Sequence, residues 1–141
     1  MFKLTEMCYT FSKRVSGNMK LTKNFKVKEF SCKDGSDPVF VNILIPAICQ
    51  VVRNWFDYPF SPNSAYRTIT HNSNEGGANS SFHVYANAVD IPASGKVTPK
   101  ELYTFLDRLC GDSCEVGLYS WGCHVGITET KKRFIDKSYK G

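Results

Sequence analysis

Histidine is scarce in this chain. Three histidines among 141 residues mean that any imidazole-based metal site must draw on His71, His83 and His124. No stretch approaches the roughly 20 apolar residues of a membrane-spanning helix, so we expect no membrane insertion. The start lacks the uninterrupted apolar core of a signal peptide, so we expect synthesis in the cytoplasm. Internal repeats and low-complexity tracts are missing too, which argues against a repeat array.

The composition is that of an ordinary globular protein. Hydrophobic residues make up 42% of the chain and charged residues 22%, which argues against disorder. The formal net charge of +5 favours encounters with anionic polymers such as nucleic acid, teichoic acid or a membrane surface, without selecting one. We expect three parts: an N-terminal extension at 1–19, one domain at 20–130, and a basic, exposed tail at 131–141.

Six cysteines are many for a cytosolic protein of this length. Because no signal peptide is visible, we interpret them as thiols rather than disulfides. Cys110 and Cys114 resemble half of a zinc-binding knuckle, but no second pair at matching spacing completes it. We therefore expect buried or incidental thiols.

Two helices stand out in the hydrophobic pattern. An apolar stripe at helical spacing covers residues 39–56, where Pro46 marks the start of the helix or a kink. Thr98 and Glu101 form a capping box around a proline at the first helical position, which predicts a helix over residues 99–110. These helices alternate irregularly with short strands, which predicts an α+β fold.

The expected strands cover residues 88–91, 116–119 and 123–127. In the last of these strands, alternation puts His124 and Gly126 on one face and the three apolar residues on the other. Residues 71–81 have the composition of a polar loop with two glycines at its centre.

The residues that carry chemistry are His83, Asp90 and His124. Hydrolytic zinc sites take three ligands from histidine and carboxylate and leave a fourth position for water. Asp90 lies in an apolar strand, where an unpaired carboxylate is costly. A metal cation, Arg67 or a set of backbone amides would each satisfy it. His124 also has apolar neighbours, so it is compatible with a neutral core histidine, and spacing alone leaves these alternatives open.

Several segments, in the right order, resemble the zinc D-alanyl-D-alanine carboxypeptidase family. Residues 81–90 (SFHVYANAVD) resemble its Ser-x-His-x-x-Gly-x-Ala-x-Asp motif, and residues 64–68 (SAYRT) resemble its Ser-Gly-Tyr-Arg-Thr motif. Residues 76–78 resemble the family's loop before its first zinc ligand, and residues 124–125 resemble its closing His-Val. Residues 25–35 resemble the N-terminal segment of the family's short, often phage-associated branch. The resemblance spans about residues 20–127.

The resemblance implies a small antiparallel sheet that carries a zinc site and is flanked by two main helices, as in the related hedgehog domain. His83, Asp90 and His124 would bind Zn²⁺, and Arg67 would bind the substrate near its reacting end. The implied activity is a zinc peptidase that cleaves peptidoglycan stem peptides at or next to D-alanine, as a carboxypeptidase or an endopeptidase. Action at the bacterial cell wall, in phage lysis or entry, would follow. We expect a monomer that binds no nucleic acid, because no nucleic-acid-binding motif is present.

Some positions depart from the family pattern. Ala65 and Ala86 stand where it prefers glycine, so we expect the backbone to avoid positive φ at both. Relatives often carry an acidic residue three positions before the last zinc histidine, or Asp two positions after it. Here those positions hold Trp121 and Gly126.

Glu115 is therefore the candidate general base, with Glu129 and Asp112 in reserve. The alternative function is a catalytically impaired, zinc-stabilised binding module of the same fold. Tyr66, Tyr119 and Trp121 either line a substrate groove or fill the core, and His71 is interpreted as part of the loop or as a support for the site.

Overall fold

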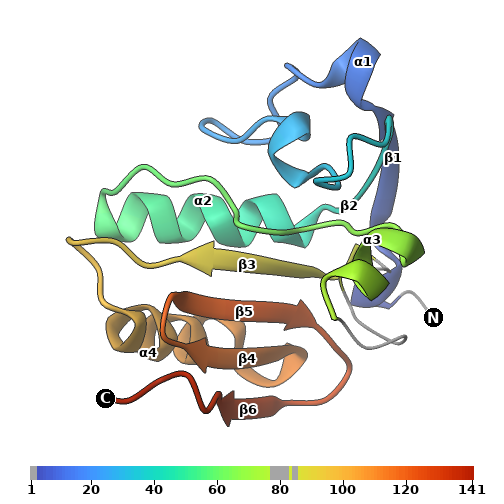
Figure 1. The fold of residues 1–141 in the computed structure, drawn as a ribbon. Coiled ribbons are helices and arrows are strands. Elements are labelled where there is room, and N and C mark those ends of the chain that lie inside the picture. Colours follow the sequence, from blue (N-terminus) through green and yellow to red (C-terminus); the bar gives the residue numbers. More distant parts are fainter. Residues whose placement is uncertain (1–2, 77–82, 84–85) are drawn as a thin grey trace.

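A four-stranded sheet is the centre of the computed structural model, which describes residues 3–76, 83 and 86–141 (Figure 1). Its strands, in spatial order, are β3 (Ala88–Pro92), β5 (Gly122–Ile127), β4 (Cys114–Tyr119) and β6 (Lys132–Ile135). β5 pairs antiparallel with both β3 and β4, whereas β6 pairs parallel with β4. A separate two-stranded sheet joins β1 (Cys8–Ser12) to β2 (Pro38–Asn42).

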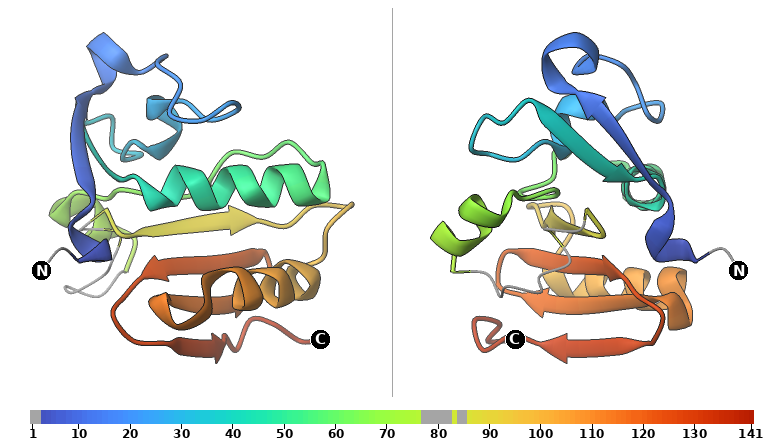
Figure 2. Two further views of the ribbon diagram at one scale, coloured as in Figure 1. Left: turned by 180° about the vertical axis from the view of Figure 1, so that it is seen from behind. Right: turned by 90° about the vertical axis from the view of Figure 1, so that its right-hand side faces the viewer.

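Two longer helices, α2 (Leu44–Phe56) and α4 (Pro99–Cys110), accompany the main sheet. α4 has the predicted bounds, and it starts at Pro99 because Thr98 Oγ1 accepts from the Glu101 N–H and the Glu101 carboxylate accepts from the Thr98 N–H. α4 lies across one face of the sheet, and α2 runs beside β3 (Figure 2). The α+β prediction with two main helices is confirmed, with β6 as one added parallel strand.

Shorter elements complete the described chain. They are the helices α1 (Lys13–Ser16) and α3 (Ile69–Asn74) and the 3-10 turns η1 (Leu4–Glu6), η2 (Val27–Phe30) and η3 (Gly111–Ser113). All six cysteines lie within the described residues, and none of them forms a disulfide. None of the described helices has the length and apolar character needed to cross a bilayer.

The two faces of the main sheet differ in character. The side chains that point toward α4 are apolar and fully buried, among them Val89, Ile91, Val116, Leu118, Cys123 and Val125. The Cys123 thiol donates to the Pro99 carbonyl of α4, which shows that this face of β5 meets the helix. The predicted alternation in β5 is confirmed, and His124 lies on the face away from α4.

Two local predictions are wrong. Residues 39–42 belong to β2 rather than to a helix, and α2 begins at Leu44. Pro46 lies in the first turn of α2, where its missing N–H would have no partner in the helix anyway. Residues 71–74 of the predicted loop belong to α3 (Ile69–Asn74), because the Thr68 side chain accepts from the His71 N–H and caps the helix.

Both ends of the chain carry structure that the sequence pattern did not indicate. In the N-terminal segment, β1 pairs with β2 along its whole length. In the basic C-terminal segment, β6 extends the main sheet beyond β4, with Lys132 opposite Glu115 and Phe134 opposite Gly117. β6 therefore adds side chains to the face that bears His124.

Gly117 leaves room for an aromatic ring beside His124. It lies between His124 on β5 and Phe134 on β6, and a Cβ at position 117 would overlap the Phe134 ring. We expect Gly117→Ala to lower the free energy of unfolding by about 1–3 kcal/mol, as overpacking does in other cores. Urea unfolding checks this value. Gly95→Ala is the matched control, because nothing lies within 4 Å of a Cβ there, and equal stability of the two variants would contradict the prediction.

Candidate metal centre

The fold brings together the three residues that the sequence motifs singled out as metal ligands. Asp90 of β3 and His124 of β5 lie directly opposite each other, and His83 lies upstream of β3. Asp90 Oδ1 is 3.2 Å from His83 Nε2 and 3.0 Å from His124 Nδ1. Their donor atoms all lie within 4.8 Å of one another, and no other such cluster occurs among the described residues. The three side chains can therefore contact one metal ion.

Residues 64–67 hold two of these side chains in place. The Asp90 N–H donates to the Ser64 carbonyl over 2.8 Å, which ties β3 to this segment. The Arg67 N–H donates to the His83 carbonyl over 3.0 Å, and His83 Nδ1–H donates to the Ala65 carbonyl over 2.7 Å. The segment at 64–67 therefore supports both His83 and Asp90, and its hydrogen bonds link distant parts of the chain.

These contacts decide which ring nitrogen of His83 is available to a metal. A carbonyl only accepts, so Nδ1 carries the hydrogen and Nε2 of the neutral ring carries a lone pair. That lone pair faces a carboxylate oxygen of Asp90 at 3.2 Å. In the protein without metal, a hydrogen on Nε2 makes this contact a hydrogen bond to Asp90, and a bound metal ion would take the place of that hydrogen. Two imidazoles and one carboxylate are the donor set of a catalytic zinc site, so the residues present fit Zn²⁺.

The charges of the cluster are strongly coupled. Burial alone would raise the pKa of Asp90, but hydrogen bonds from His124 and His83 outweigh it and hold that pKa below its ordinary value. Burial alone would lower the pKa of His124, but its hydrogen bonds to Asp90 and Glu115 raise that pKa to about 9. Without metal, His124 therefore carries a proton on each ring nitrogen at neutral pH, and a metal ion at Nδ1 would replace one of them.

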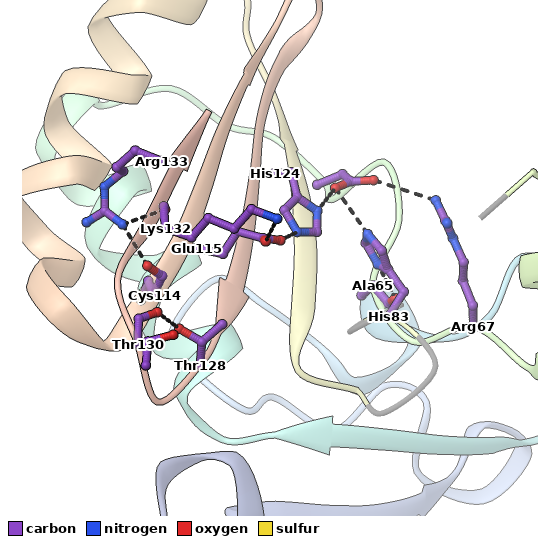
Figure 3. Close-up of polar contacts among 11 residues, drawn as sticks. Ala65, Arg67, His83, Cys114, Glu115, His124, Thr128, Thr130, Lys132 and Arg133 are labelled. Carbon is purple, nitrogen blue, oxygen red and sulfur yellow. Dashed lines mark hydrogen bonds and ion pairs between the residues drawn. The ribbon is translucent and has the colours of Figure 1, made fainter. Parts of the chain in front are cut away.

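Glu115, the candidate general base, lies on the other edge of the His124 ring (Figure 3). Its Oε1 is 2.9 Å from His124 Nε2, and its Oε2 is 3.3 Å from Lys132 Nζ. The hydrogen bond from His124 lowers the pKa of Glu115, against the opposing effect of burial. Glu115 also lies opposite Gly126 in the strand register, where the family pattern often has an acidic residue.

The reserve candidates for the base lie elsewhere. Glu129 pairs with Lys3 at 3.2 Å on the surface, and Asp112 is exposed in η3. Neither of them lines the pocket at the cluster.

Arg67 contacts Asp90 and lies on the opposite side of His124 from Glu115 (Figure 3). Its Nη2 is 3.7 Å from Asp90 Oδ2, while Nε donates to Ser64 Oγ over 2.9 Å. Nη1 donates to Asn72 Oδ1 over 3.3 Å. Arg67 therefore belongs to the ion-pair network of the cluster and at the same time faces the pocket.

The cluster opens into a pocket of about 370 Å³. Its lining comprises Arg67, His83, Asp90, Glu115, Tyr119, Trp121, His124, Lys132 and Phe134. The rings of Tyr119 and Trp121 stack, with centroids 4.9 Å apart. A neighbouring pocket of about 350 Å³ shares Arg67, Asp90 and Trp121 and also contains His71. Tyr66 instead packs edge-on against Phe40.

One prediction about the backbone near the site is wrong. Ala86 has a φ of 61°, the left-handed conformation that the family pattern fills with glycine, whereas Ala65 avoids positive φ as expected. The Ala86 N–H donates to the His83 carbonyl over 3.1 Å. The parts of the motif at 81–82 and 84–85, and residues 77–78 of the glycine loop, lie outside the described residues.

Lys132 and Phe134 line the pocket, although nothing in the sequence pattern marked them as pocket residues. The alternation of Lys132, Arg133, Phe134 and Ile135 is compatible with a strand, but it gives no sign of which sheet the strand joins.

A comparison with protein-family models matches residues 21–127 to peptidase M15. The matched part includes the three candidate ligands together with Arg67 and Glu115, and it ends before β6. A search among curated proteins found no significant match. The α+β architecture is compatible with the M15 fold. The chain belongs to the peptidase M15 family, whose members are zinc-dependent peptidases.

Proposed function

We propose that this protein is a zinc peptidase that cleaves peptidoglycan stem peptides at or next to D-alanine. The observation that carries the proposal is the His83–Asp90–His124 cluster at the base of a pocket that Arg67 also lines, in a chain of the M15 family. His83 Nε2, His124 Nδ1 and the Asp90 carboxylate would hold the ion. Bound zinc supplies a Lewis acid and lowers the pKa of a coordinated water toward about 7.

The charges around the cluster favour a substrate with a carboxylate. Arg67 and Lys132 line the pocket on opposite sides of the metal ligands. The Arg67 guanidinium is held in orientation by Ser64 and Asn72, so its planar fork is prepared for a terminal carboxylate or a polarised carbonyl. The stacked Tyr119 and Trp121 provide an apolar wall for small side chains.

The net charge agrees with a substrate in the bacterial cell wall. A formal charge of +5 attracts the protein to anionic wall polymers. We propose that it acts at the wall as a monomer, in phage lysis or entry.

One observation favours a second candidate, a zinc-stabilised module that binds such peptides without cleaving them. The two carboxylates that line the pocket, Asp90 and Glu115, both contact His124. A general base has to reach the proton that it removes from water. Neither carboxylate is placed for that task alone, because each of them also contacts His124.

The deciding experiment measures zinc content and then D-alanine release from a muramyl pentapeptide. We expect one zinc ion per wild-type chain and measurable release. His83→Ala should lose both, because it removes one of three ligands. His71→Ala is the matched control for zinc content, because His71 lies outside the metal cluster. Zinc-loaded wild type with no turnover on pentapeptide, cross-linked dimers or intact sacculi would rule out the peptidase and leave the binding module.

A further inference from the structure

We propose that Glu115 is a positioning residue: it holds the His124 ring so that Nδ1 is presented to the metal. The proposal rests on the zinc site proposed above. It assigns Glu115 a task other than proton transfer from water.

The contacts of the His124 ring lead to this assignment. Both ring nitrogens face carboxylates, with Asp90 Oδ1 3.0 Å from Nδ1 and Glu115 Oε1 2.9 Å from Nε2. An ionised carboxylate only accepts, so Nε2 must carry a hydrogen to satisfy Glu115. In the neutral ring that binds metal, the lone pair is then on Nδ1, on the side of Asp90 and His83. Glu115 thus selects both the tautomer and the orientation of the ring, as outer carboxylates do for metal-bound histidines.

Glu115 is itself well fixed. It lies in the central part of the sheet, paired with Gly126 of β5 on one side and Lys132 of β6 on the other. Its side chain is 11% exposed, and its second oxygen faces Lys132 Nζ at 3.3 Å. A buried carboxylate with one donor at each oxygen has little freedom to turn toward a substrate.

The same contacts argue against Glu115 as the general base. Oε1 is occupied by His124 Nε2–H, and Oε2 is occupied by Lys132. The imidazole ring lies between the Glu115 carboxylate and the Asp90 oxygen, so Glu115 is on the far edge of the ring from the expected ion. A base that accepts a proton from bound water needs direct reach or one bridging water.

The strand beyond the family match contributes to this arrangement. Lys132 belongs to β6, which begins after the matched residues 21–127. One row of paired residues across β5, β4 and β6 consists of Gly126, Glu115 and Lys132. The neighbouring row consists of His124, Gly117 and Phe134. β6 therefore supports the metal site through Glu115.

The test compares the zinc affinity of wild type, Glu115→Gln and Glu115→Ala by competition with a chelator. Glu115→Ala is expected to bind zinc about 10–100-fold more weakly, the usual cost of losing an outer partner. Glu115→Gln should lose less, because its amide oxygen still accepts from Nε2–H. The visible spectrum of the Co²⁺-substituted protein should shift in Glu115→Ala, since the ring is no longer held. Glu6→Gln, an exposed carboxylate of η1, is the control that should match wild type.

Two results would overturn the proposal. One is unchanged zinc affinity and an unchanged Co²⁺ spectrum in folded Glu115→Ala. The other is Glu115→Gln with wild-type zinc affinity and abolished turnover, which would make Glu115 the general base. Failure of the zinc site itself is distinguishable, because His83→Ala would then bind zinc as tightly as wild type does.

Discussion

An Asp90→Asn protein is expected to bind zinc more than about 100-fold more weakly than wild type and, free of metal, to lose about 3 kcal/mol of stability. The loss of zinc affinity should exceed the cost of removing an outer partner, because Asp90 is the proposed oxygen ligand of the cluster and lies within 3.2 Å of both histidines. Asparagine keeps the shape of the side chain, so the loss reports on charge rather than on packing.

The loss of stability follows from the partners that Asp90 would leave behind. Arg67 and protonated His124 are both mostly buried, and Asp90 is the anion between them. Breaking a buried pair by removing one member usually costs about 3–5 kcal/mol, since the remaining charge stays desolvated. Urea unfolding in the presence of a chelator measures this loss of stability separately from zinc binding.

Asp37→Asn is the matched control for Asp90→Asn. Asp37 is an exposed carboxylate that accepts from the Ser12 hydroxyl and the Arg14 N–H and does not line the pocket. We expect it to leave zinc affinity unchanged. Wild-type affinity in Asp90→Asn would mean that the cluster does not bind zinc through this carboxylate.

An Arg133→Met protein is expected to lose about 3 kcal/mol of stability, which lowers its midpoint of thermal unfolding by roughly 10 °C. Arg133 Nε donates to Asp107 Oδ1 over 2.6 Å, and its terminal nitrogens donate to the carbonyls of Cys114 and Gly111 over 2.6 Å each. These bonds tie β6 to the end of α4 and satisfy carbonyls where the helix stops. Hydrogen bonds from a charged donor contribute about 1.5–3 kcal/mol each, and exposure of Asp107 reduces that sum.

Thermal unfolding monitored by circular dichroism checks the Arg133 prediction. Arg108→Met is the matched control, because Arg108 is exposed on the same helix. The Arg133 hydrogen bond lowers the pKa of Asp107, so the contribution of this pair is present at neutral pH and is lost as the pH falls through that lowered pKa. Equal midpoints for the two variants would show that β6 is held by other contacts.

The Arg133 result also bears on the site. β6 carries Lys132 and Phe134 into the pocket, and Lys132 contacts Glu115. If β6 detaches, Glu115 loses one of its two partners, and zinc affinity should fall together with stability.

Local features of this protein followed from the sequence. The capping box set the start of α4, because a helix start depends on residues three positions apart. Alternation in β5 assigned His124 and the apolar residues to opposite faces, because strand geometry repeats every two residues. The motif order also singled out His83, Asp90 and Arg67, and the structure brings them to one place.

The tertiary structure decided what depends on contacts between distant segments. The register that sets Asp90 opposite His124, and Glu115 opposite both Gly126 and Lys132, arises from strand pairing that no local pattern encodes. The left-handed conformation of Ala86 and the addition of β6 are likewise set by the surrounding structure. The sequence by itself determined which residues are available to the proposed metal ion. Only the folded sheet decided that Nδ1 of His124 faces Asp90 while Nε2 faces Glu115, because the orientation of a ring depends on its neighbours in space.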